Sequence, residues 1–240
     1  MSSGVFQRKE IKFLLDSRQR SALEQAMATH MKIDEYGEST ICSLYYDTPD
    51  YRLIRRSLDK PEYQEKLRLR SYGTAAPGAD IFVELKKKYA GVVYKRRVQL
   101  PEDQVAPWLA GQRDCPRDSQ IGREVDWFVN YYGTLRPAMY LCYDRTAWFC
   151  PEDGDLRVTF DRNIRWRTDN LSLTVPPWGE QLLAPGQSLL EIKAAAGLPL
   201  WLTAALSKNQ IRQTSFSKYG SAYTLLTERE RYERGGVSCA

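Results

Sequence analysis

The segment Lys66-Leu67-Arg68-Leu69-Arg70 shows the pattern on which the rest of the chain is built. In an extended strand successive side chains point to opposite faces, so Lys66, Arg68 and Arg70 share one face and the two leucines share the other. Taken alone, this pattern is typical of a strand at the solvated edge or face of a sheet. A functional interpretation requires the same pattern in other strands.

The alternation of charged and apolar side chains recurs along the chain. Glu84, Lys86 and Lys88 alternate with Val83 and Leu85, for example, and the loop before this segment is rich in Gly, Ala and Pro. Such alternation over a short run predicts a strand with one apolar face. The strands that we expect are Arg8–Phe13, Ser39–Asp47, Lys66–Tyr72, Ile81–Lys88, Val93–Val98, Ala138–Phe149, Leu156–Asp161 (with Asn163–Arg167 as a continuation or turn) and Leu189–Lys193.

Helical spacing of apolar residues appears between these strands. Ser17 suits the N-cap of a first helix, whose pattern continues to Met31, and Pro101 suits the entry to another. The further helices that we expect are Glu102–Leu109, Gly122–Tyr132, Leu198–Leu206 and a last one that ends near Glu233. Strands with inserted helices, without regular βαβ repeats, predict an α+β fold. We expect one domain over residues 1–240, with a core of about residues 5–228 and a flexible C-terminal tail.

The composition is that of an ordinary globular protein, with 42% hydrophobic and 27% charged residues and a net charge of +5. These values exclude a disordered chain and do not identify a partner. The five cysteines form no C-x-x-C pair, so neither a disulfide framework nor a zinc site is indicated. No signal segment or long apolar run is present, so we expect a cytoplasmic protein without a transmembrane segment in this chain.

Many strands that carry charge on one face predict a closed sheet with a polar interior, and closure also removes sheet edges. An open sheet with one solvated face is the alternative. In the closed form the cations would converge, which is costly unless a dense anion neutralises them, so a chain of phosphates is the expected ligand. The converging cations would be Arg8, Lys12, Lys66, Arg68, Arg70, Lys86, Lys88, Lys95, Arg97, Arg145, Arg157 and Lys193.

Carboxylates on the same faces suggest a divalent cation, since Mg²⁺ and Mn²⁺ bind carboxylate and phosphate oxygens together. The candidates are Glu10, Glu84 and Glu191. No G-x-x-x-x-G-K-S/T loop is present, and the only histidine, His30, has no evident role as a base. Phosphoryl transfer needs neither, because positioning and charge neutralisation supply most of its catalysis.

These segments together resemble the VTC (vacuolar transporter chaperone) polyphosphate polymerase domain, of the CYTH-like triphosphate tunnel metalloenzyme superfamily. The resemblance covers nearly the whole chain, and the order of its motifs makes it specific. The matching motifs are Arg8–Phe13, Tyr45–Thr48, Lys66–Arg70, Phe82–Lys86, Tyr94–Arg97, Tyr143–Ala147, Arg157–Asp161, Leu190–Lys193 and Phe216–Tyr219.

The resemblance implies an eight-stranded antiparallel β tunnel with flanking helices, which transfers the terminal phosphate of ATP or another nucleoside triphosphate to inorganic polyphosphate with Mn²⁺ or Mg²⁺. Glu191 would be the main metal ligand, with Glu10 and Glu84 as weaker candidates. The residues that would contact phosphate or nucleotide are Arg8, Lys12, Arg68, Arg70, Lys86, Lys95, Arg97, Tyr143, Arg145, Arg157, Lys193, Ser217 and Lys218.

One departure separates this chain from the related CYTH branch, whose first strand carries an E-x-E-x-K motif. Arg8 stands at the first Glu position, which favours the polymerase-like branch. A tripolyphosphatase or nucleoside triphosphatase of the same fold is the alternative, as is a non-catalytic polyphosphate-binding module. No nucleic-acid partner is expected, and a separate membrane partner and the oligomeric state are left open.

Overall fold

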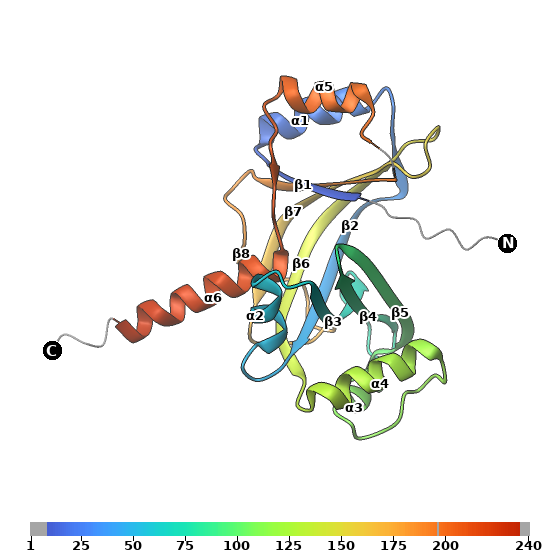
Figure 1. Cartoon of the computed structure of the whole chain (residues 1–240), viewed down its shortest axis with the longest axis vertical. Helices are drawn as coiled ribbons and strands as arrows, with labels where there is room; N and C mark the ends of the chain where they lie inside the picture. Colours follow the sequence, from blue (N-terminus) through green and yellow to red (C-terminus); the bar gives the residue numbers. More distant parts are fainter. Residues whose placement is uncertain (1–8, 196, 236–240) are drawn as a thin grey trace. The chain divides into compact units, whose positions relative to one another are not determined.

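The computed structural model describes residues 9–195 and 197–235 and has an α+β fold (Figure 1). Its helices are α1 (Ser17–Met27), α2 (Arg52–Leu58), α3 (Glu102–Leu109), α4 (Gln120–Tyr132), α5 (Leu200–Lys208) and α6 (Lys218–Gly235). Its strands are β1 (Lys9–Leu15), β2 (Lys32–Asp47), β3 (Tyr63–Tyr72), β4 (Asp80–Tyr89), β5 (Val92–Pro101), β6 (Arg136–Phe149), β7 (Arg157–Arg167), β8 (Glu180–Gln181), β9 (Ser188–Ala194) and β10 (Gln213–Thr214).

The strands pair in the order β10-β1-β9-β7-β6-β2-β3-β4-β5, with β8 paired to β7. Every pair whose register is described is antiparallel, as the sequence predicts. Within the residues described here, no pairing joins β5 to β10, so the sheet is open at these two strands. The closed eight-stranded tunnel therefore stays a prediction.

The chain divides into two compact units. Unit 1 comprises Met1–Thr40, Tyr143–Ile164 and Leu183–Phe216, and unit 2 comprises Ile41–Cys142, Arg165–Leu182 and Ser217–Ala240. The strands β2, β6 and β7 each pass from one unit into the other. The single domain expected from the sequence stays a prediction.

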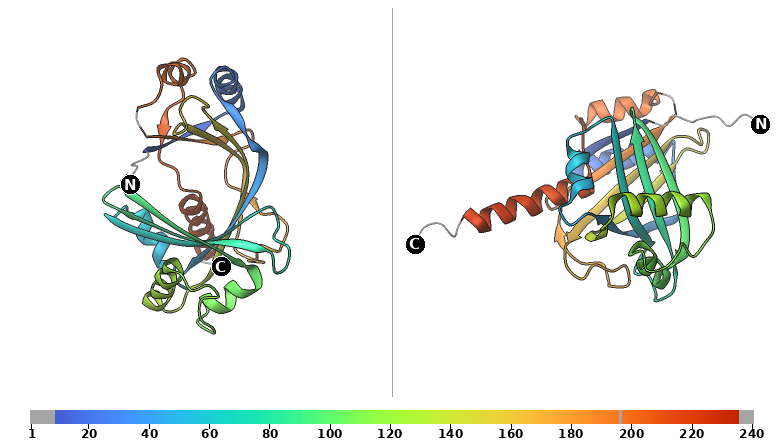
Figure 2. Two further views of the ribbon diagram at one scale, coloured as in Figure 1. Left: turned by 90° about the vertical axis from the view of Figure 1, so that its right-hand side faces the viewer. Right: turned by 60° about the horizontal axis from the view of Figure 1, so that its bottom comes forward.

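Unit 1 packs the apolar face of its strands against α1 and α5, which lie side by side (Figures 1 and 2). Phe13 on β1, Phe160 on β7 and Leu190 on β9 are buried there, because the register places all three in one row. Leu23 of α1 and Leu202 of α5 are completely buried against this face. Burying a large apolar side chain stabilises the fold by about 1.5–3 kcal/mol.

Unit 2 packs the apolar face of β3, β4 and β5 against α3 and α4. Helix α4 runs across these strands in the right-hand view of Figure 2. Leu67, Val83 and Leu85 are completely buried on this face, where Phe128 of α4 joins them. The leucines of the 66–70 segment therefore face the core and its cations do not, as the alternation predicts.

The hairpin between β4 and β5 has a two-residue turn, Ala90-Gly91. Both residues have positive φ, 46° and 83°, and the flanking Tyr89 and Val92 are paired. A turn of this kind suits the twist of two antiparallel strands and favours glycine. Gly91 thus allows the tight turn that joins β4 to β5.

The first helix differs from the expectation at both ends. Its N-cap is Asp16 rather than Ser17, because the Asp16 carboxylate accepts the Gln19 backbone N–H at 2.7 Å and the Gln19 side chain accepts the Asp16 backbone N–H at 3.1 Å. The helix ends at Met27, short of the expected Met31.

Helix α2 was not predicted from the sequence. The Asp47 carboxylate at the end of β2 accepts the backbone N–H groups of Leu53 and Ile54 at 2.8 and 3.0 Å, which satisfies the first turn of α2. A cap six residues upstream leaves no signal in a pattern based on neighbouring residues.

In the two stretches of chain that the structure covers, we find no helix with the length and apolar character needed to cross a membrane. Arg8 and the expected tail after Gly235 lie outside the described residues.

Candidate functional site

The polar face of unit 2 is defined by the register of β2, β3, β4 and β5. Arg68 lies opposite Tyr45 on β2 and opposite Glu84 on β4, and Glu84 lies opposite Arg97 on β5. The next rows on this face pair Arg70 with Phe82, and Lys86 with both Lys66 and Lys95. Directly opposed residues in antiparallel strands point to the same side, so these side chains share one face.

A buried carboxylate lies at the centre of this face. The side chain of Glu84 is 1% exposed and forms ion pairs with four cations, which together with it we call the unit-2 cluster: Arg68, Arg70, Glu84, Lys95 and Arg97. Arg68 Nε and Nη2 both lie 2.7 Å from Glu84 Oε2, and Arg97 Nε and Lys95 Nζ lie 2.7 and 2.8 Å from Oε1. One carboxylate therefore orients two arginine forks and a lysine.

The pKa values of this cluster follow from its charges. Burial by itself raises the pKa of the Glu84 carboxyl, but Arg68, Arg70 and Lys95 outweigh burial and hold this pKa well below its usual range. Burial lowers the pKa of Lys95 to about 8, helped by the charges of Arg97 and Arg70 and opposed by Glu84. Glu84 is thus ionised at neutral pH.

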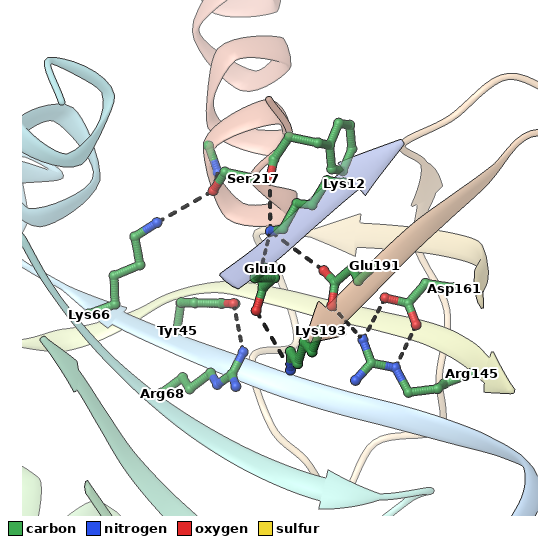
Figure 3. Close-up of polar contacts among 12 residues, drawn as sticks. Glu10, Lys12, Tyr45, Lys66, Arg68, Arg145, Asp161, Glu191, Lys193 and Ser217 are labelled. Atoms are coloured by element: carbon green, nitrogen blue, oxygen red, sulfur yellow. Dashed lines mark hydrogen bonds and ion pairs between the residues drawn. The ribbon is translucent and has the colours of Figure 1, made fainter. Parts of the chain in front are cut away.

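Tyr45 contacts the third nitrogen of the Arg68 guanidinium, whose other two nitrogens contact Glu84. Arg68 Nη1 donates to the Tyr45 hydroxyl at 3.2 Å (Figure 3). The Tyr45 ring stacks on Tyr219 with 4.4 Å between ring centroids. The Tyr219 hydroxyl donates to Asp47 Oδ2 at 2.9 Å. Burial alone raises the pKa of Tyr45, but the charges of Arg68, Lys66 and Arg70 lower it to about 8. A phenol with this pKa reports the positive potential on this face.

The start of α6 meets the same face of unit 2. Lys66 Nζ donates to Ser217 Oγ at 3.4 Å, and Ser217 Oγ also accepts the backbone N–H of Gly220 at 3.1 Å (Figure 3). Ser217 is therefore held at the N-terminus of α6, with Lys218 as the first residue of the helix. The predicted roles of Ser217 and Lys218 in phosphate binding stay predictions.

Unit 1 carries a second group of ion pairs, which we call the unit-1 cluster: Glu10, Lys12, Arg145, Asp161, Glu191 and Lys193. Lys12 Nζ lies 3.2 Å from Glu10 Oε1 and 3.5 Å from Glu191 Oε1, and donates to the Phe216 carbonyl at 3.1 Å (Figure 3). Lys193 Nζ lies 3.6 Å from Glu10 Oε2. Two carboxylates thus converge on one ammonium group.

Arg145 is held by a fork-to-fork ion pair. Its Nε and Nη2 donate to the two oxygens of Asp161 at 2.6 and 2.7 Å, and Nη2 also donates to Glu191 at 3.3 Å. Asp161 is completely buried. Burial opposes the charge of Arg145, but Tyr143, Asp161 and Glu191 raise the pKa of this guanidinium well above its ordinary value. The Arg145 guanidinium also lies 5.2 Å from the Tyr143 ring centroid.

The carboxylates that could hold a metal differ between the units. Glu10 and Glu191 each bring an oxygen to the Lys12 ammonium, and oxygens gathered in this way suit a hard divalent cation once phosphate oxygens complete the set. Glu84 is surrounded by cations instead. Within residues 9–195 and 197–235, no group of three or more His, Cys, Asp or Glu side chains is arranged to hold a metal ion alone.

Three further candidates, Arg157, Lys86 and Arg8, do not belong to either cluster as defined above. Arg157 is exposed, lies opposite Lys193 in the register, and has its guanidinium 5.5 Å from the Phe149 ring centroid. Lys86 is partly buried in its row between Lys66 and Lys95. Arg8 lies outside the described residues. Each of these assignments stays a prediction.

Three residues to which the sequence assigned no role support the site, and two of them contact candidate cations. Tyr45 contacts Arg68, Asp161 contacts Arg145, and Asp47 accepts hydrogen bonds from Tyr219 and from the start of α2. Tyr45 and Asp47 belong to the Tyr45–Thr48 motif and Asp161 closes the Arg157–Asp161 motif. The sequence signal that could have identified them is their spacing: each lies two positions from another polar residue of its motif, on the same strand face.

Comparison with known proteins finds a family model and two relatives that carry the same family name. A family model described as "VTC domain" matches residues 7–227. Vacuolar transporter chaperone complex subunit 2 of Schizosaccharomyces pombe is 24% identical over 228 residues, which cover 78% of this chain and 31% of that protein. Subunit 4 of the same complex is 28% identical over 149 residues, covering 53% of this chain and 20% of that protein. The chain thus spans about a third or less of these relatives.

Among solved structures, a provisionally assigned adenylate cyclase from Bacillus halodurans is similar, with a TM-score of 0.52 and 13% identity. The match covers 88% of this chain and 95% of that one. At this level of identity the likeness concerns the fold alone.

Proposed function

Because the chain belongs to the VTC domain family, we propose that it binds a nucleoside triphosphate and transfers its terminal phosphate to a growing chain of inorganic polyphosphate. This is the activity that the resemblance of the sequence implies. ATP is the simplest donor, and the acceptor is the terminal phosphate of polyphosphate.

The observation that carries this proposal is the excess of cations on the polar face of unit 2. Four cations surround one carboxylate in the unit-2 cluster, and Lys66 and Lys86 extend the same face. A solvated outer face would not need a buried carboxylate to orient its arginines. A preorganised row of guanidinium and ammonium groups suits a linear anion, because each phosphate can accept bidentate or point-charge contacts.

The transfer itself requires little covalent chemistry from the protein. A terminal oxygen of polyphosphate attacks the γ-phosphorus of ATP, the bond between this phosphorus and the β–γ bridging oxygen breaks, and ADP leaves with that oxygen. The attacking phosphate is already ionised, so no strong base is required. The cations of the unit-2 cluster would hold the reacting phosphates and neutralise the charge that moves to the leaving oxygen.

A divalent cation fits the carboxylates of the unit-1 cluster. We assign Glu191 and Glu10 as its ligands, with Glu84 as the weaker candidate because four cations already surround it. When bound, Mn²⁺ or Mg²⁺ would polarise phosphoryl oxygens. Lys12, which both glutamates contact, would then be released to pair with phosphate.

The direct test incubates the purified chain with ATP and Mn²⁺ or Mg²⁺ and analyses the products by gel electrophoresis and nucleotide chromatography. We expect ADP together with phosphate chains that lengthen with time. The matched control is Arg96→Gln, which removes an exposed cation from the opposite face of β5, where it pairs with Glu124. Its product pattern should equal that of the wild type.

Two other outcomes would replace this proposal. Release of orthophosphate without chains would indicate a tripolyphosphatase or nucleoside triphosphatase of the same fold. Binding of polyphosphate without any turnover in the presence of metal would indicate a non-catalytic binding module.

A further inference from the structure

The polar face of unit 2 changes in chemistry at one end. Beyond Arg70, the next residue of β3 on this face is Tyr72, which lies opposite Ile41 on β2, and the residues of β4 and β5 level with Arg70 are aromatic or amide rather than cationic. Arg70 lies opposite Phe82, and Phe82 lies opposite Gln99. Asp80, two residues before Phe82, belongs to the same face. The row of cations therefore ends in two aromatic rings, a carboxamide and a carboxylate.

These aromatic rings do not belong to the hydrophobic core. Ile81 and Val83, the neighbours of Phe82 in β4, are completely buried on the opposite face, whereas Phe82 itself is only partly buried. Tyr72 is 57% exposed and packs edge-to-face against Phe82, with 6.0 Å between centroids and 88° between ring planes. The Arg97 guanidinium lies 4.2 Å from the Phe82 centroid. An aromatic pair is thus held next to a cation of the unit-2 cluster.

Polar groups accompany the rings. Gln99 Nε2 donates to Asp80 Oδ2 at 2.9 Å, and both side chains are exposed. An amide and a carboxylate offer both donors and acceptors, which the edge of a base or the hydroxyls of a ribose can use. Two residues along an extended strand span about 7 Å, so Tyr72 lies about one sugar-sized step beyond Arg70.

We propose that Tyr72 and Phe82 form a stacking site for the base of the nucleotide, with Gln99 and Asp80 hydrogen-bonding its base edge or ribose. The α-phosphate then lies near Arg70, and the β- and γ-phosphates lie toward Arg68 and Arg97. This inference rests on the proposed function and adds a direction to it. Along β3 the nucleoside occupies the Tyr72 end, and the phosphate path runs toward the row of Lys66, Lys86 and Lys95.

The test compares ATP with inorganic tripolyphosphate, which has the same number of phosphates and no nucleoside. Affinities of the full chain are measured by isothermal titration calorimetry without metal. Stacking of a base on an aromatic side chain contributes about 1–3 kcal/mol, so Tyr72→Ala should weaken ATP binding by about tenfold or more. The same variant should bind tripolyphosphate within about twofold of the wild type, which also shows that it is folded.

Further variants make the comparison specific. Phe82→Leu keeps an apolar side chain but removes the ring, and should also weaken ATP selectively. Tyr94→Ala removes a tyrosine that is 48% exposed on the opposite face of β5, and should change neither affinity. Gln99→Leu should reduce the difference in affinity between ATP and other nucleoside triphosphates.

The outcomes separate this inference from the proposed function. Equal losses of ATP and tripolyphosphate in Tyr72→Ala, or no loss of ATP, would overturn the base site while the phosphate site stands. A wild-type chain that binds neither ligand would overturn the proposed function, and the base site with it.

Discussion

The unit-1 and unit-2 clusters differ in their balance of charge. In the unit-1 cluster the cations Lys12, Arg145 and Lys193 are matched by three carboxylates, those of Glu10, Asp161 and Glu191. In the unit-2 cluster four cations share the single carboxylate of Glu84. Each cluster lies on the strand face opposite an apolar core face.

This difference predicts two kinds of phosphate binding. An excess of cations attracts an anion directly, so the unit-2 cluster should bind tripolyphosphate without metal. A charge-balanced cluster gains little from an anion unless a divalent cation joins its carboxylates. The unit-2 cluster is therefore the proposed site of metal-free anion binding, and the unit-1 cluster is the proposed site of a divalent cation.

The largest effect is expected for Glu84→Gln. Removing a buried charge that pairs with four cations should lower the free energy of unfolding by about 3 kcal/mol, measured by urea denaturation without anions. Tripolyphosphate should restore part of this loss, because its charge replaces that of the carboxylate. Glu124→Gln is the control, since Glu124 pairs with Arg96 near the surface. A loss that tripolyphosphate does not reduce would contradict the role of unit 2 as an anion site.

Glu191→Gln tests unit 1 in the same way. We expect the rate of ATP turnover with Mn²⁺ to fall by about a hundredfold, because a metal ligand is lost, while metal-free binding of tripolyphosphate stays within about twofold. Glu38→Gln, which removes an exposed carboxylate of unit 1 that pairs with Arg162, should leave turnover unchanged. Unchanged turnover in Glu191→Gln would show that the metal assignment is wrong.

The pH dependence of stability should report the positive potential of unit 2. The pKa of Tyr45 is lowered from 10.0 to about 8, so the folded chain binds fewer protons than the unfolded chain between these values. This contribution is fully present above pH 10 and is lost as the pH falls through 8, with a size of at most about 3 kcal/mol. Lys95, lowered from 10.5 to about 8, acts in the same direction.

Phenolate absorbance provides the measurement for Tyr45. A step with its midpoint near pH 8 should appear in the wild type and be absent in Tyr45→Phe. Tripolyphosphate should move the midpoint upward, because an anion near the phenol offsets the charges of Arg68 and Lys66. A midpoint that the anion leaves unchanged would place the anion elsewhere.

The smallest effect is expected for the affinity of Tyr45→Phe at neutral pH. This variant keeps the ring that stacks on Tyr219 and loses one hydrogen bond to Arg68, which contributes about 1 kcal/mol. Tripolyphosphate should bind about fivefold more weakly, measured by calorimetry, and Tyr94→Phe should have no effect. An equal effect in both variants would remove Tyr45 from the site.

Much of the fold could be predicted from local patterns. The alternation in 66–70 and 81–88 correctly assigned which side chains face the core, because a strand has a period of two whatever it packs against. Helix α3 was predicted with its exact bounds, since Pro101 and helical spacing are both local signals. Helix α2 was missed, because its cap comes from Asp47 at the end of β2.

The candidate site was predictable in its charges and not in its contacts. The sequence by itself determined that Arg68, Arg70 and Glu84 lie on polar strand faces and that the chain belongs to the VTC domain family. Only the tertiary structure decided that Glu84 is shared by four cations while Asp161 is bound to Arg145. The physical reason is register: side-chain alternation is a property of one strand, but which charges meet depends on how neighbouring strands are aligned, and their packing against the cores sets that alignment.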